Sequence, residues 1–428
     1  MIAEIDEMVN TLIGEQEPGV AVAVVKSGQL VHGKGYGLAN LEWNIPVQPD
    51  TVFRLASLTK QFTATAILLL EQQGRLRTDE PLTHFLPNYP THGHSISVAH
   101  LLTHTSGISP YNEVDNFFEL YARKRLSYAD VLNLIQNLPL EFEPGTRYKY
   151  NNSGYYLLGM IIEAVAGRSY ENFLQEQVFT PLGMKHSYYL WNEALISQRA
   201  GGYIKTEHGY QNAPFLDMTV PYAGGALGST LNDLVRWDAA LDQGHLLNKE
   251  ILERMHTPAQ LRDGRTTEYG FGWGIGDYRG HRVAYHQGEI NGFISFLARF
   301  LDDAVTVILL SNSNGRDVEI LCRRIIRQVL EIPPLNHKIT HLELHDLKMM
   351  IGTYTLGKLF KCVVQQTENK IILHPFNVEL KPIQKTMCCF AHDHEIEVRF
   401  SDQEDQTFRT MTIHFPFSPL TLTRQRLN

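Results

Sequence analysis

Cysteine is scarce in this chain and is missing from its first three hundred residues. The four cysteines, at the end of the sequence, are Cys322, Cys362, Cys388 and Cys389. Since no pair has the Cys-x-x-Cys spacing of a zinc ligand set, the sequence predicts no structural zinc site. So few cysteines are typical of a protein from a reducing compartment rather than of a secreted protein built on disulfides.

Long hydrophobic runs and clusters of basic residues are also missing. The longest apolar candidate, ATAILLLEQQG, meets charge after a few residues and is too short to span a membrane. The acidic start, MIAEIDEMVN, lacks the basic and apolar segments of a secretory signal, so we expect a cytoplasmic protein. The net charge of −8 gives no electrostatic reason to expect a nucleic-acid partner.

The hydrophobic pattern predicts an α+β fold in the larger part of the chain. Two apolar runs flanking residues 26–29 predict a hairpin, and further strand-like runs come at 270–275, 281–286, 292–300 and 304–312. Helical patterns dominate the sequence between them, and the one at 57–74 is apolar almost all round, which predicts a central, buried helix. We therefore expect an antiparallel sheet flanked by helices, with a helical insertion.

A second domain is expected at the C-terminal end. With 428 residues the chain exceeds one ordinary core, and the pattern breaks at the Pro-rich segment IPPLNH. Short alternating runs such as GTYTL, KIILH and EIEVRF follow it, a rhythm that predicts a small antiparallel barrel or sandwich. We predict a catalytic domain at 1–332, a linker at 333–342 and the small β domain at 343–428.

Ser57 and Lys60 form a Ser-x-x-Lys motif where the buried helix is predicted to start. Three residues make nearly one helical turn, so both side chains project from one face. A serine hydroxyl is a weak nucleophile until a base takes its proton, and a buried lysine can be that base. About one or two such matches are expected by chance in a chain this long, and a capping serine beside a surface lysine is the plain alternative.

Two other segments could complete such a site. Tyr150 and Asn152 precede a helical pattern, where a phenol could carry a proton and an amide could hold a substrate carbonyl. His286 ends the run HRVAYH and is followed by Gln287-Gly288, where glycine would let a substrate approach the strand edge. Taken singly, a packed tyrosine and a strand-end histidine explain these residues equally well.

Together, and in this order, the motifs resemble those of the penicillin-binding-protein-like serine hydrolases. That group includes class C β-lactamases, D-Ala-D-Ala carboxypeptidases, D-aminopeptidases and related esterases. The similarity extends over about residues 15–331 and also includes VAHLLTHTSGI, YNNSGYYLLG, PLGM, AGGALGSTLNDLVRW and YGFGWG. It implies a β-lactamase/transpeptidase-like fold, and the C-terminal segment resembles the lipocalin-like barrels appended to some of these peptidases.

The resemblance also implies roles for individual residues. Ser57 would be the nucleophile, Lys60 and Tyr150 would manage the protons, and Asn152 would contact the acyl side of the substrate. His286 stands where β-lactamases usually carry lysine, which puts efficient antibiotic hydrolysis in doubt. The strand segment Gly288-Glu289 would bind substrate, with the backbone N–H groups of Ser57 and Glu289 as the oxyanion hole. No cofactor is implied.

Other sites and functions are compatible with parts of the sequence. His92, His94, His100 and His104 have spacings that could bind a metal, but we expect none, because VAHLLTHTSG matches a framework segment of the resembled group. The favoured function is hydrolysis of small peptides or D-amino-acid-containing substrates. A carboxylesterase or weak β-lactamase is the first alternative, and a non-catalytic scaffold is the second. The C-terminal barrel would cover the active-site mouth, form a homo-oligomer, or be passively attached.

Overall fold

A computed structural model describes residues 2–314, 316–335, 337–356, 360–367, 370–391, 393–404, 407–414 and 419–424. The chain divides into two compact units, of which the first comprises 1–275 and 281–330 and the second comprises 276–280 and 331–428. The expected linker at 333–342 thus falls within the second unit, where the Thr340 amide donates a hydrogen bond to the Pro382 carbonyl.

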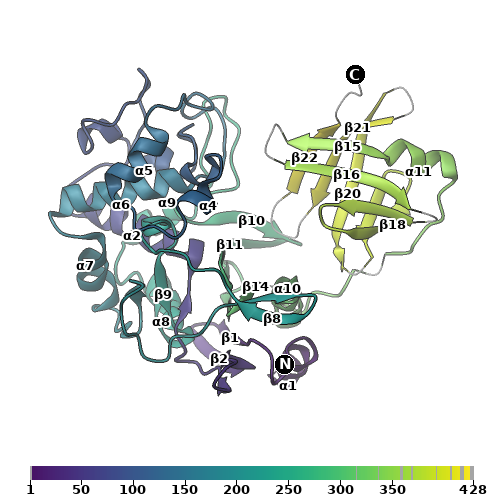
Figure 1. Ribbon diagram of the computed structural model, residues 1–428, viewed down its shortest axis with the longest axis horizontal. Helices are drawn as coiled ribbons and strands as arrows, with labels where there is room; N and C mark the ends of the chain where they lie inside the picture. Colours follow the sequence, from purple (N-terminus) through teal and green to yellow (C-terminus); the bar gives the residue numbers. More distant parts are fainter. Residues whose placement is uncertain are drawn as a thin grey trace. The chain divides into compact units, whose positions relative to one another are not determined.

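The first unit is built on a sheet that joins the two ends of its sequence; of this sheet, only residues 276–278 in the edge strand belong to the second unit. Its strand order is β10-β11-β12-β13-β1-β2, so β1, the first strand of the unit, lies beside β13, one of the unit's last. Figure 1 shows the purple β1 and β2 and the green β10 and β11 of this sheet. The strands are β1 (Val20–Lys26), β2 (Gln29–Tyr36), β10 (Gly274–Tyr278), β11 (His281–Ile290), β12 (Phe293–Phe300) and β13 (Val305–Ser311). β1 is antiparallel to both β2 and β13, as β12 is to β11 and β13. This confirms the predicted antiparallel sheet.

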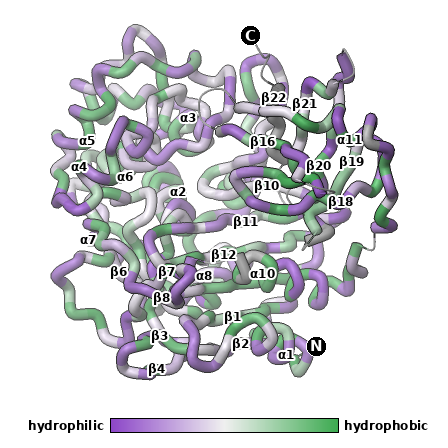
Figure 2. Tube along the Cα trace, turned by 45° about the vertical axis from the view of Figure 1, so that its right-hand side comes forward, coloured by the Kyte–Doolittle hydropathy of each residue, from purple (hydrophilic) through white to green (hydrophobic). Residues whose placement is uncertain are grey.

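The sequence of β1 explains its central place. The run VAVAVV is buried throughout, as expected of a strand covered on both faces, and it is green in Figure 2. Ser27 and Gly28 follow with φ angles of 50° and 73°. Positive φ at both positions is what a two-residue turn of type I′ requires, and the twist of this turn matches that of its strands. The hairpin predicted at 26–29 is confirmed.

Helices cover the sheet and fill the insertion. α8 (Leu231–Gln243) packs on β1 and β13, α10 (Arg316–Val329) packs on β13, and α1 (Ile2–Leu12) packs on α10. The insertion contains α2 (Thr59–Gln72), α3 (Val98–Leu102), α4 (Phe117–Leu120), α5 (Tyr128–Ile135), α6 (Asn152–Ala166), α7 (Tyr170–Leu174), α9 (Lys249–Met255) and the short helices η1 (Ala56–Leu58) and η5 (Tyr222–Gly224). Smaller sheets pair β3 (Leu38–Asn40) with β4 (Ile45–Pro46), β9 (Leu227–Ser229) with β5 (Phe53–Arg54) and β6 (Tyr188–Tyr189), and β7 (Tyr203–Thr206) with β8 (Gly209–Asn212) and β14 (Ser313–Asn314).

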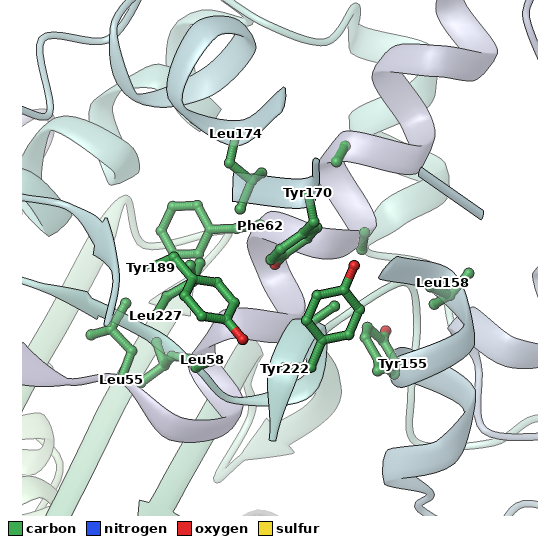
Figure 3. Close-up of a cluster of buried hydrophobic side chains, with 14 of the residues drawn as sticks. Leu55, Leu58, Phe62, Tyr155, Leu158, Tyr170, Leu174, Tyr189, Tyr222 and Leu227 are labelled. Atoms are coloured by element: carbon green, nitrogen blue, oxygen red, sulfur yellow. The ribbon is translucent and has the colours of Figure 1, made fainter. Parts of the chain in front are cut away.

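Helix α2 is the centre of the insertion. Every residue from Thr59 to Leu70 is buried, which confirms the helix predicted to be buried all round. Its Phe62 ring lies 4.4 Å from that of Trp237, between ring centroids, and Figure 3 shows Phe62 among leucine and tyrosine side chains of several elements. The helix that follows Ser57 is therefore held by packing on all sides.

One predicted strand is wrong in its position. The run at 270–275 was expected to be extended, but β10 starts only at Gly274. Gly272 has a φ of 80°, and a Cβ built there would lie 2.7 Å from the Lys60 carbonyl oxygen. Glycine allows this close approach, so the segment packs against α2 instead of continuing the sheet.

The second unit is a closed barrel. It consists of β15 (Gly352–Leu356), β16 (Phe360–Thr367), β17 (Lys370–His374), β18 (Val378–Gln384), β19 (Met387–Phe390), β20 (Asp393–Glu404), β21 (Thr407–His414) and β22 (Pro419–Arg424), preceded by α11 (Leu344–Met350). Pairing of Tyr354 with Arg424 closes it, and Cys362, Val364 and Val398 belong to its buried core. The predicted antiparallel barrel is confirmed. In neither unit do the described residues include a helix long and apolar enough to cross a bilayer.

Candidate active site

Ser57 sits in a strained turn at the start of α2. The residue before it, Ala56, has a φ of 48°, a left-handed conformation that non-glycine residues adopt rarely and that clusters at functional sites. The turn is tied to the sheet, because the Ser295 hydroxyl on β12 donates a hydrogen bond of 2.6 Å to the Leu55 carbonyl. The serine is thereby fixed between the sheet and the central helix.

Lys60 is fully buried and points at this serine. Its Nζ lies 3.1 Å from Ser57 Oγ, 2.9 Å from Asn152 Oδ1 and 2.8 Å from the Gly224 carbonyl oxygen. Burial lowers its pKa from 10.5 to about 7, because a charged amine loses its hydration there. A neutral amine has two N–H donors for the two carbonyl oxygens, which leaves its lone pair facing the serine hydroxyl. The arrangement is that of a base beside a nucleophile.

Tyr150 lies on the other side of the amine. Lys60 Nζ is 4.8 Å from the centroid of its ring. Burial raises the pKa of the Tyr150 phenol, an effect that its hydrogen bond with the Ser57 side chain partly offsets, so the phenol keeps its proton at neutral pH. The neighbouring Asn151 caps α6 by accepting from the Gly154 amide at 3.2 Å, and this fixes the segment that carries Tyr150 and Asn152.

His286 is next to this group, but its ring nitrogens are bonded elsewhere. Nδ1 donates to the Gln287 carbonyl at 2.7 Å, so Nε2 of the neutral ring accepts from the Tyr269 hydroxyl at 2.8 Å. The ring centroid is 6.1 Å from that of Tyr150. Burial, and then the charge of Lys60, lower the pKa of His286 to about 3. The imidazole is therefore neutral at physiological pH and supports Tyr269.

The Gly288-Glu289 segment of β11 lies against the turn that carries Ser57. A Cβ built on Gly288 would lie less than 3.0 Å from the Leu55 carbonyl oxygen and 2.9 Å from the Ser57 amide nitrogen. Only glycine fits this contact. The Glu289 carboxylate accepts a hydrogen bond of 3.0 Å from the Asn314 side chain. The structure thus brings the strand edge predicted to bind substrate directly beside the serine.

A cavity of about 380 Å³ opens onto Ser57. Ser57, Asn152 and Glu289 form part of its wall, and amide groups of three further asparagines share it with apolar side chains. These other lining residues include Asn112, Phe117, Phe118, Leu216, Val220, Ile290, Asn291 and Asn314. Such a cavity offers hydrogen bonds to a carbonyl group and room for one apolar substituent.

Comparison with known proteins identifies the family. The family described as Beta-lactamase matches residues 5–331, which is most of the chain and includes the whole site. The chain belongs to this family. It is a serine hydrolase with a β-lactamase/penicillin-binding-protein fold, and the resemblance seen in the sequence is confirmed.

The chain is similar to several proteins in sequence or in structure. "Penicillin-binding protein 4*" of Bacillus subtilis (strain 168) is 29% identical over 412 residues, 90% of each chain. The D-amino acid amidase from Ochrobactrum anthropi SV3 is 27% identical, with a TM-score of 0.65 over 77% of this chain and all of the other. The octameric penicillin-binding protein homologue from Pyrococcus abyssi is 24% identical, with a TM-score of 0.69 over 99% of both chains. Because this last similarity covers nearly the whole chain, it includes the barrel as well as the first unit.

Several groups at the site were missed by the sequence analysis. The Gly224 carbonyl accepts from Lys60, and Asn112 accepts a hydrogen bond of 3.3 Å from the Asn152 side chain. Tyr269 binds His286, and Ser295 anchors the serine turn. Gly224 and Tyr269 do lie in segments that resemble the family, but nothing in the spacing of these residues connects them with Ser57.

Two of the four histidines considered as metal ligands, His100 and His104, serve different structures. His100 accepts a hydrogen bond of 3.1 Å from the Ser97 amide in the cap of α3. His104 is buried against the aromatic side of the site, with its ring 4.3 Å from that of Tyr150. Within the described residues, no group of three or more His, Cys, Asp or Glu side chains could hold a metal ion.

Proposed function

We propose that this enzyme is a peptidase or amidase that cleaves small substrates through an acyl-enzyme on Ser57. The observation that carries the proposal is the fully buried Lys60, whose Nζ lies 3.1 Å from Ser57 Oγ and whose pKa is lowered to about 7. When the pKa of a base lies near the working pH, a large fraction of the base is unprotonated and can accept a proton, and it still binds that proton strongly.

In the proposed reaction, Ser57 Oγ attacks the substrate carbonyl carbon while its proton passes to Lys60 Nζ. The negative charge that develops on the carbonyl oxygen would be stabilised by the backbone N–H groups of Ser57 and Glu289. The C–N bond then breaks, and the leaving amine takes a proton from the Tyr150 phenol, which recovers one from Lys60. Water repeats the sequence on the ester and releases the acid, regenerating the serine.

The cavity supports a small substrate with one apolar group beside the reacting carbonyl. Asn152 lies on the cavity wall, where its Nδ2 could donate to the acyl-side carbonyl, while its Oδ1 accepts from Lys60. Because a relative in fold and sequence is a D-amino acid amidase, D-amino-acid amides and short peptides containing D-residues are the substrates to test first. Short esters and a chromogenic cephalosporin are the other members of this panel of test substrates.

Covalent labelling tests the nucleophile. We expect a fluorophosphonate to add one label to the intact protein, seen by mass spectrometry, and peptide mapping to place it on Ser57. The Ser57→Ala protein should remain unlabelled, whereas Ser311→Ala, which removes a buried hydroxyl at the end of β13, should still react. Equal labelling of the wild-type and Ser57→Ala proteins would contradict the mechanism.

His286 should affect the rate without setting its pH dependence. Replacing it by leucine removes the acceptor for Tyr269, and the loss of one buried hydrogen bond corresponds to about a tenfold lower kcat/KM. Because the pKa of His286 is about 3, the shape of the rate profile between pH 5 and 9 should stay unchanged. If the variant loses a rise near pH 7, that rise belongs to the histidine and not to Lys60.

Self-association through the barrel stays a prediction, as does a separate domain at 343–428. The barrel has its own closed sheet and core, so a chain ending at residue 337 should still fold. Light scattering would then give a smaller number of copies per particle than for the full chain. An unchanged number of copies, together with an unchanged substrate range, would make the barrel a passive attachment.

A further inference from the structure

A second cavity, of about 300 Å³, lies in the catalytic unit and takes no part in the proposed reaction. Its lining residues include members of α5, α6, α7, η5 and the segment after β6. None of these residues also lines the cavity at Ser57, although other residues of α6 and η5 do. Its walls are mainly aromatic. We call the group formed by Tyr128, Tyr156, Tyr189, Trp191 and Tyr222 the tyrosine cage.

The rings of the cage are held at angles to one another. The Tyr222 ring is tilted against that of Tyr156 at 4.9 Å between centroids and against that of Tyr128 at 5.3 Å, and Tyr189 is tilted against Trp191 at 4.5 Å. Figure 3 shows Tyr189 and Tyr222 beside Tyr170, with rings turned in different directions. Tyr156, Tyr189 and Tyr222 are almost completely buried, whereas Tyr128 is 37% exposed. The cage is thus rigid on one side and open at Tyr128.

The charges at the cage are mainly negative. Glu163 accepts from the Tyr128 hydroxyl at 2.7 Å and from the Tyr170 amide at 2.8 Å, and Glu171 accepts from the Trp191 indole at 2.7 Å. These donors are neutral and leave the carboxylate charges in place. The one cation in the lining, Arg125, lies over the Trp191 ring and pairs with Glu193 at 3.0 Å.

Several tilted aromatic rings beside carboxylates suit a particular class of ligand. The face of an aromatic ring attracts a cation, and clusters of such faces recognise alkylated ammonium groups. A hydrated metal ion would need a shell of oxygen ligands instead, and an anion would be repelled by the two glutamates. A neutral apolar ligand would make no use of the negative charges of Glu163 and Glu171 in the cavity wall.

We propose that the tyrosine cage is a binding site for an organic ammonium ion, with Glu163 as its counter-charge. The site is separate from the reaction at Ser57 and does not depend on it. Tyr222 is nevertheless in the same short helix, η5, as the Gly224 carbonyl that accepts from Lys60. A test must therefore distinguish binding in the cage from binding in the cavity at Ser57.

Calorimetric titration of the full-length protein with choline provides this test. Choline should bind about tenfold or more tightly than 3,3-dimethylbutan-1-ol, its uncharged carbon isostere, since cation–π attraction is the difference between them. Glu163→Gln, and Tyr128→Leu at the exposed edge, should each weaken choline binding several-fold, while Tyr128→Phe keeps the ring and most of the affinity. Thermal melting confirms that the variants are folded.

Two control variants separate the sites. Glu289→Gln changes the carboxylate in the cavity at Ser57, and Glu176→Gln changes an exposed glutamate that pairs with Arg168; both should bind choline as the wild type does. The proposal is overturned if choline does not bind, if it binds no better than its isostere, or if Glu289→Gln, rather than Glu163→Gln, removes the binding.

Discussion

Replacing Lys60 by methionine should lower kcat by about 10³-fold or more, because proton transfer by a positioned side chain is worth about 10²–10⁴-fold and the lysine serves both half-reactions. Methionine keeps much of the side-chain volume in this fully buried place, so the protein should stay folded. Steady-state hydrolysis of the best substrate in the panel measures the effect. Lys185→Met, at an exposed position, should leave the rate unchanged.

The pH profile gives the same prediction a second readout. Since the lysine must be neutral to accept a proton and its pKa is about 7, kcat/KM should rise about tenfold per pH unit below 7 and level off above it. Stability should respond as well. A lysine with a pKa of 10.5 in the unfolded chain and about 7 in the fold loses its proton on folding between these values, so wild-type stability should rise from pH 7 to 10.5.

The Lys60→Met variant should lose this stability slope together with its activity. Melting temperatures across the same pH range provide the measurement. A variant that keeps most of the wild-type rate, or a wild-type rate that does not change between pH 5 and 8, would show that another group takes the serine proton.

Gly288→Ala is the second change with a large expected effect. Its Cβ would lie less than 3.0 Å from the Leu55 carbonyl oxygen and 2.9 Å from the Ser57 amide nitrogen, so the strand or the serine turn must shift. A displacement of about 1 Å at a reacting group can cost about 10²-fold in rate, and we expect a loss of that size in kcat/KM. The reaction rate with the fluorophosphonate should fall in parallel.

Gly33→Ala is the matched control for this change. Gly33 is also a strand glycine, but a Cβ there meets only the Leu30 side chain, which is 48% exposed and can move. Its activity should be that of the wild type. If Gly288→Ala is equally active, the contact between β11 and the serine turn does not position the nucleophile.

The sequence predicts well what depends on local pattern. The spacing of Ser57 and Lys60 places both side chains on one helical face, and the structure brings them to 3.1 Å. The hairpin at 26–29 and the buried α2 follow from turn chemistry and hydrophobic periodicity. In these cases the residues that decide the conformation are neighbours in the chain.

Contacts between distant segments were not predictable in the same way. Lys60 donates to the carbonyl of Gly224, 164 residues away. Because every residue has a backbone carbonyl, the sequence does not indicate which of them accepts this hydrogen bond. His286 is predicted to complete the catalytic site, but the sequence does not indicate that its ring nitrogens bind Tyr269 and Gln287. The run at 270–275 has strand-like composition, yet Gly272 fits against α2 and tertiary packing decides its conformation.

The pairing of β1 with β13 also has a consequence during synthesis on the ribosome. Val20 pairs with Ser311, and the strand that abuts the serine turn carries Gly288. Ser57, the proposed nucleophile, emerges early, but the strands that support it are translated more than two hundred residues later. Because such long-range pairings form late, a nascent chain cannot hydrolyse anything until almost the whole catalytic unit has left the exit tunnel.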